Sequence, residues 1–123
     1  MRFDAIVVGG SFAGLAADAN ASGPLVQPLA DEIAMQGYAG SVAFDGAGAR
    51  VAITSPRGGR LHVFDQNGFA ESVLRPDICG VAPASEGFLA TDGLGGVMAA
   101  GVDGLVTLSR HDNAWDNHLV VIG

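Results

Sequence analysis

From Gly37 onward, apolar and polar residues alternate in short segments that are separated by glycine-containing turns. A period of two places successive side chains on opposite faces of a strand, so this pattern predicts an all-β region. The expected strands form two sets of four and one further strand: Ser41–Phe44, Arg50–Thr54, Leu61–Phe64 and Ala70–Leu74; Gly80–Pro83, Phe88–Thr91, Val97–Ala99 and Leu105–Ser109; and Leu119–Ile122.

The two sets of expected strands repeat one another along the chain. The matching residues lie 36 to 39 positions apart: Val42 with Val81, Val51 with Phe88, Gly58 with Gly95, and Gly68 with Gly104. A four-stranded propeller blade has a period of about 40 residues. Residues 37–123 are therefore predicted to be mainly β, as a partial β-propeller of about two four-stranded antiparallel blades plus one strand.

Such a piece leaves sheet faces uncovered. A propeller closes a ring of about 4–8 blades, in which each blade covers the face of its neighbour. Two blades with apolar faces open at both ends are expected either to belong to a larger ring or to self-associate through those faces.

The N-terminal part differs in texture and is predicted as a leader over residues 1–22 and a linker over residues 23–36. Phe3–Val8 is an apolar, β-branched run typical of a buried strand. A glycine turn follows it, and Leu15–Ala19 then favours helix. This short βα segment precedes the blades, and a further helical turn is expected at residues 31–36.

Charge and cysteine content exclude several classes of function. The net charge is −7, there is no Lys, and the six Arg residues are scattered, so neither nucleic acid nor an anionic membrane surface is an expected partner. No apolar run is long enough to span a bilayer. Cys79 is the single cysteine, which excludes an intrachain disulfide and a paired-cysteine zinc site. No Ser, His and Asp grouping has the spacing of a hydrolase, and no catalytic residue is assigned.

The densest polar cluster runs from His111 to His118. If the segment from Asp116 is extended, Asp116 and His118 share one face. The repeat places His118 level with Ser41 and Gly80, at the starts of the innermost strands, which line the axial channel of a propeller. The hypothesis is that Ser41, Asp116 and His118 bind a small ligand or ion at the mouth of that channel. The alternative is a hydrogen-bonded loop with Trp115 packed on the blade edge.

Residues from about 36 to the end resemble the C-terminal part of the bacterial family called domain of unknown function 1513. The segments that carry the resemblance are Gly37–Ala43, Ile53–Arg60, Thr91–Gly93 and Trp115–Leu119. The resemblance implies a seven-bladed propeller, usually exported to the periplasm and often encoded beside iron-uptake proteins. It implies no reaction. As written, this chain has no convincing export signal and is expected in the cytoplasm.

Residues 1–18 resemble the FAD-binding N-terminus of flavin-dependent pyridine-nucleotide oxidoreductases, through Asp4–Leu15. In that motif three small residues, here Gly9, Ser11 and Gly14, make the turn, admit the pyrophosphate and allow close helix–strand packing. Binding also needs a parallel sheet, and no βαβαβ continuation follows. No cofactor is therefore expected, with FAD as the alternative.

Three functions remain open at this point. The leading one is a non-enzymatic binding or scaffolding protein whose partner is an unknown small ligand or protein. The alternatives are a remnant of an FAD/NAD(P)-dependent oxidoreductase, and a fusion or truncated product without an independent function.

Overall fold

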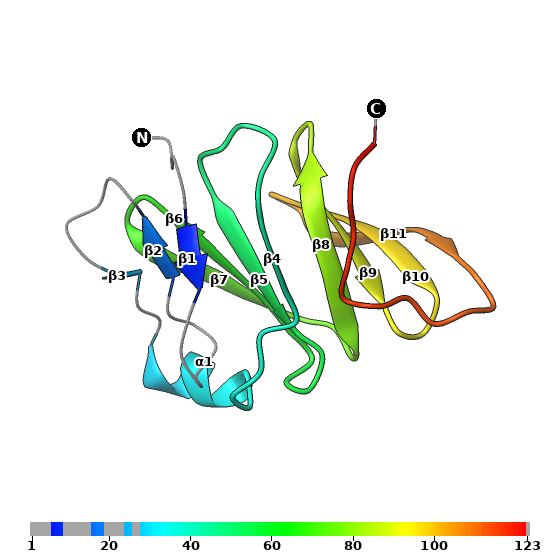
Figure 1. Cartoon of the computed structure of the whole chain (residues 1–123), viewed down its shortest axis with the longest axis horizontal. Helices are drawn as coiled ribbons and strands as arrows, with labels where there is room; N and C mark the ends of the chain where they lie inside the picture. The colour runs from blue at the N-terminus through cyan, green and yellow to red at the C-terminus, as the bar shows by residue number, and fades with distance from the viewer. Residues whose placement is uncertain (1–5, 9–15, 19–23, 26–27, 123) are drawn as a thin grey trace.

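The computed structural model describes residues 6–8, 16–18, 24–25 and 28–122 (Figure 1). Its main part consists of two four-stranded antiparallel sheets, each formed by strands that are consecutive in the chain. We call them blade 1 and blade 2. Blade 1 contains β4 (Ser41–Phe44), β5 (Val51–Ser55), β6 (Arg60–Asp65) and β7 (Gly68–Leu74). Blade 2 contains β8 (Ile78–Ala84), β9 (Gly87–Asp92), β10 (Gly96–Gly101) and β11 (Gly104–Arg110).

These sheets confirm the predicted fold class, and each of the eight strands overlaps the segment expected for it. The reason is local: turn residues bound every strand, and apolar residues alternate within it. Gly68, Gly87, Gly95 and Gly104 have φ between 84° and 107°, a conformation that strains other residues. Glycine therefore fixes where these strands begin.

The N-terminal elements correct one prediction. β1 (Ile6–Val8) pairs antiparallel with β2 (Ala16–Asp18), and β2 pairs with β3 (Pro24–Leu25). The helix expected at Leu15–Ala19 is wrong, because residues 16–18 form β2. A helix of so few residues is marginal in water, whereas pairing with β1 satisfies its backbone groups. The short helix before the blades is α1 (Leu29–Ala34), close to the expected helical turn.

The expected last strand is also wrong, because Leu119–Ile122 forms no ladder. The segment runs beside β8 in Figure 1, and a side chain at Gly80 would meet the Leu119 Cβ at 3.0 Å. β4 and β8 are likewise neighbours that belong to different sheets. The segment therefore lies beside β8 much as β8 lies beside β4, but it pairs with no described strand.

The largest apolar cluster lies between the two blades. It combines one face of blade 1 with one face of blade 2: Ala52, Leu61, Val63, Ile78, Val81, Phe88, Ala90, Met98 and Ala100. Ala43, Val73 and Leu105 pack at its edge. The two blades therefore stack face to face, and each buries side chains of the other.

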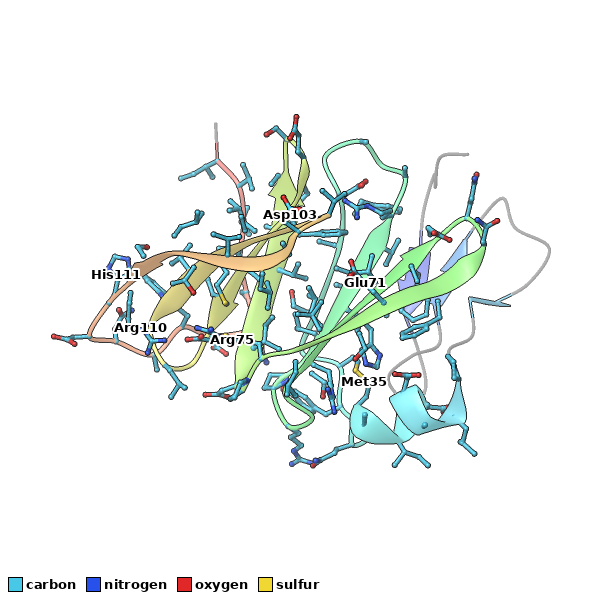
Figure 2. All side chains as sticks on the ribbon, turned by 180° about the vertical axis from the view of Figure 1, so that it is seen from behind. Met35, Glu71, Arg75, Asp103, Arg110 and His111 are labelled. Carbon is cyan, nitrogen blue, oxygen red and sulfur yellow. The ribbon has the colours of Figure 1, made fainter. Side chains whose placement is uncertain are left out.

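The opposite face of blade 1 is buried as well. Val51, Ile53 and Phe64 form a second cluster with Met35, and all four are fully buried. Met35 follows α1 and lies between α1 and blade 1 (Figure 2). The Ser55 hydroxyl donates a hydrogen bond to the Met35 carbonyl oxygen at 2.7 Å, which ties this segment to the end of β5.

Candidate functional site

Ser41, the first residue of β4, joins the two blades. Its hydroxyl oxygen accepts a hydrogen bond from the Val81 N–H at 3.3 Å and lies 3.5 Å from the Val81 carbonyl oxygen. The Thr54 hydroxyl, opposite Ser41 in blade 1, donates to the Cys79 carbonyl at 2.5 Å. The half-buried Ser41 side chain is thus engaged with blade 2 rather than directed at a ligand.

The segment after blade 2 crosses the starts of both innermost strands. Asn117 donates from its side-chain nitrogen to the Tyr38 hydroxyl at 3.0 Å, and its Oδ1 lies 3.1 Å from where a Cβ on Gly40 would be. Asp116 and His118, on either side of Asn117, are both exposed. The structure therefore brings the predicted Ser41, Asp116 and His118 to one end of the innermost strands.

This arrangement is not a metal centre of the usual kind. Within residues 28–122 and the described strands before them, no three His, Cys, Asp or Glu residues are grouped to hold a metal ion. Asp116 accepts a hydrogen bond from the neighbouring Asn117 N–H at 2.7 Å, as a loop carboxylate commonly does. Binding of a ligand by Ser41, Asp116 and His118 stays a prediction.

Cys79 has no features of a reactive thiol. It is buried, and its sulfur lies 3.4 Å from the carbonyl oxygens of Thr91 and Trp115. Burial raises the pKa of its thiol above the usual value. A thiol that stays protonated is a weak nucleophile. Cys79 therefore has a packing role, at the junction between β8, β9 and the final segment.

The residues of the flavoenzyme-like turn, Gly9, Ser11 and Gly14, lie outside the described residues. The strands that flank them, β1 and β2, are antiparallel, whereas a dinucleotide site needs a strand followed by a helix in a parallel sheet. Nothing in the described part of the chain supports the resemblance to flavin-dependent enzymes.

An ion pair that sequence reasoning missed connects blade 1 to blade 2. Arg75 lies between β7 and β8 (Figure 2). Its guanidinium contacts the Asp92 carboxylate at 2.6 and 2.8 Å. Asp92 also accepts from the N–H groups of Leu94 and Gly96. Burial alone would raise the pKa of Asp92, but these hydrogen bonds and Arg75 together lower it. The only sequence signal was an Asp at the end of an expected strand.

A hollow of about 540 Å³ lies at the opposite ends of the strands, among the β4–β5, β8–β9 and β10–β11 turns. Arg50 borders it, pairs with Asp45 at 3.1 Å and lies over the Phe88 ring. Glu86 and Asp103 also border it. The carboxylates of Asp45, Glu86 and Asp103 and the Arg50 guanidinium therefore border this hollow.

The outer face of blade 2 is an apolar surface that no described sheet covers. Strand register places Leu89, Ala99 and Val106 opposite one another on this face, with Val97 beside them. Leu89, Val97 and Ala99 are half-buried, and Val106 is 53% exposed. The neighbouring final segment adds exposed Val120, Val121 and Ile122. We call the residues Leu89, Val97, Ala99 and Val106 the open face.

Comparisons with known proteins agree with this architecture but bring no activity. A family model described as "Protein of unknown function (DUF1513)" matches residues 12–122, a range that includes both blades. No curated protein matches the chain. No described helix is long and apolar enough to cross a membrane.

Proposed function

The chain belongs to the DUF1513 family of proteins of unknown function, and on this premise we propose that it is a non-enzymatic binding or scaffolding protein. Its binding surface is the open face of blade 2, and its partner is another protein surface. Large exposed apolar patches on folded proteins mark sites of association.

The observation that carries this proposal is the correspondence between the two blades. The registers of β5 with β6 and of β9 with β10 align Ala52, Leu61 and Val63 of blade 1 with Leu89, Val97 and Ala99 of blade 2. The three blade 1 residues are at most 2% exposed, because blade 2 covers them. The blade 2 residues present the same kind of face, and no sheet among the described residues covers it.

Chemistry at this face is limited to packing. Its four side chains are aliphatic and offer no nucleophile, acid or base. The hydrophobic effect contributes about 25 cal/mol per Å² of apolar surface removed from water, so a complementary sheet face would be bound without any polar contact. This supports a scaffolding role rather than an enzymatic one.

A fluorescent apolar dye, anilinonaphthalene sulfonate, tests whether the open face is accessible in the full chain. Val106→Asp is expected to lower the dye fluorescence by about twofold or more, because it places a charge on the face. The matched control is Val102→Asp, since Val102 is 93% exposed on the β10–β11 turn. Equal fluorescence in both variants, with near-UV circular dichroism unchanged, would contradict the proposal.

A further inference from the structure

We propose that the turn between β6 and β7 is a site of covalent modification, at which Asn67 loses its side-chain amide nitrogen and becomes aspartate or isoaspartate. Asparagine is a thermolabile residue. Asn67 is the asparagine of this chain that a glycine, Gly68, follows. The inference is independent of the proposed binding role, because it concerns a turn of blade 1 and not the open face.

The reaction consumes water and needs no other reactant. The backbone nitrogen of Gly68 gives up its proton to hydroxide and attacks Cγ, the side-chain carbonyl carbon of Asn67. The new N–Cγ bond closes a five-membered imide, the Cγ–Nδ2 bond breaks, and the side-chain nitrogen takes up a proton and leaves as ammonia. Water then opens the imide. Breaking the N–Cγ bond leaves aspartate, and breaking the original peptide bond leaves isoaspartate, in which the main chain runs through the side chain.

The local structure leaves the reacting groups accessible. Asp65 and Gly68 pair across the two-residue turn of Gln66 and Asn67, and the Asn67 side chain is exposed. The Asn67 N–H donates to the Asp65 carboxylate at 2.7 Å, while no described residue holds the side-chain amide in a hydrogen bond. A Cβ at Gly68 would meet no atom within 4 Å, so the space around its Cα is open. Because Gly68 pairs with Asp65, local opening of the turn precedes the attack, and the reaction is slower in the folded chain than in the unfolded one.

The other asparagines of blade 2 and the final segment lack these features. Asn113 precedes Ala114 and Asn117 precedes His118, so a Cβ stands beside each attacking nitrogen. Asn117 also donates from its side-chain nitrogen to the Tyr38 hydroxyl at 3.0 Å, which holds the amide group in place. These two residues are therefore internal controls for the reaction.

Blade 2 shows that the aspartate product fits the fold. Gly101 and Gly104 pair across the matching two-residue turn, and the residue before Gly104 is Asp103. The φ of Gly104 is 84° and that of Gly68 is 107°, so both turns use a glycine with positive φ. Isoaspartate instead adds one methylene, about 1.5 Å, to the main chain where the turn closes. We therefore expect aspartate to leave the hairpin intact and isoaspartate to loosen the pairing of β6 with β7.

Peptide mass mapping of the full chain, incubated for days at mildly alkaline pH, tests this inference. The peptide that contains Asn67 is expected to gain about 1 Da, at a rate about tenfold or more above that of the segment with Asn113 and Asn117. Each event adds one negative charge to a chain of net charge −7, so ion exchange separates the products from the starting chain. Enzymatic methylation specific for isoaspartyl carboxylates distinguishes the two products.

A matched pair of variants tests the role of the glycine. Gly68→Ala places a Cβ beside the attacking nitrogen and is expected to slow the mass gain at Asn67 by about tenfold or more. Gly104→Ala makes the same change in the turn of blade 2 and should leave the rate at Asn67 within about twofold. Circular dichroism shows whether each variant is folded. If Gly68→Ala does not fold, the comparison of the three asparagines in the unaltered chain decides.

Three results would overturn the inference. Equal rates at Asn67, Asn113 and Asn117 would show that the turn has no special reactivity. A folded chain that stays unmodified at Asn67, while the same chain in urea gains mass there, would show that the native hairpin blocks the attack. A rate that a folded Gly68→Ala variant leaves unchanged would exclude the imide route.

Discussion

Blade 1 and blade 2 are built from the same repeat, yet one is covered on both faces and the other on one. All five residues of β5 are buried, with Val51 and Ile53 facing one cluster and Ala52 the other. In β10, buried Met98 and Ala100 alternate with half-buried Val97 and Ala99. Whether a blade face is buried therefore depends on the sheet or segment packed against it and not on the sequence of its own strands.

Different parts of the chain pack on the faces of the two blades. Blade 2 covers one side of blade 1, and the segment around Met35 covers the other. Blade 2 has blade 1 on one side, while on the other the final segment reaches only its inner edge, near Gly80. The exposed apolar residues Val106, Leu108 and Ile122 all lie on or after the last strand of blade 2.

The largest expected effect comes from the face that the blades share. Phe88→Ala removes a side chain that is 1% exposed and is expected to lower the free energy of unfolding by about 4 kcal/mol. Leu108→Ala, at a residue 58% exposed in β11, is expected to cost less than about 0.5 kcal/mol. Urea denaturation measures both. Similar costs for the two variants would mean that the blades do not pack as described.

The next effect is a pH dependence of stability that arises from a buried histidine in blade 1. His62 is fully buried on the Val51 side of blade 1 and contacts the Phe69 ring edge-on; Met98 stands at the corresponding place in blade 2. Burial lowers the pKa of His62 to about 4 from 6.5; Asp31 opposes this shift and Arg60 adds to it. Between pH 4 and 6.5, His62 is therefore protonated in the unfolded chain but neutral in the folded chain.

Stability from neutral His62 is complete above pH 6.5 and is lost as the pH falls toward 4. The loss amounts to about 3 kcal/mol in the free energy of unfolding. Urea denaturation between these pH values is expected to show it, and His62→Leu should flatten the profile. His111→Leu removes an exposed imidazole of the segment after blade 2 and should leave the profile as it was. A profile that His62→Leu does not change would contradict this explanation.

The smallest of the three effects is the loss of stability caused by substitutions at the ends of β5 and β9. Asp92→Asn keeps the shape of the side chain but leaves Arg75 without its carboxylate, and a cost of about 2 kcal/mol is expected. The Arg75 side chain is 23% exposed, so solvent reduces the penalty. Ser55→Ala, at the matching position of blade 1, removes hydrogen bonds to Met35 and Gly58 and should cost about 1 kcal/mol. Thermal unfolding of the two variants checks their order.

Much of the fold was predictable because its signals are local. The strand at Ser41–Phe44 was predicted with the bounds that the structure has, and the other blade strands begin or end within a few residues of the expected positions. Alternation, glycine turns and a period near 40 residues act over short distances. The candidate ligand residues Ser41, Asp116 and His118 were placed at one end of the innermost strands by the same repeat.

The errors share one cause. Residues 16–18 favour helix by composition but pair with Ile6–Val8, and Leu119–Ile122 has the pattern of a strand but no strand beside it to complete a ladder. Arg75 and Asp92 are 17 residues apart and meet only when blade 2 stacks on blade 1. Partners distant in the chain decide such features, and a single sequence does not name them.

The repeated strands and their turns could be read from the sequence, because alternation and glycine conformation are properties of neighbouring residues. The tertiary structure alone decided which faces are covered. Leu89 and Ala52 occupy matching positions in two similar strands, and only the presence or absence of a sheet against them makes one half-buried and the other fully buried.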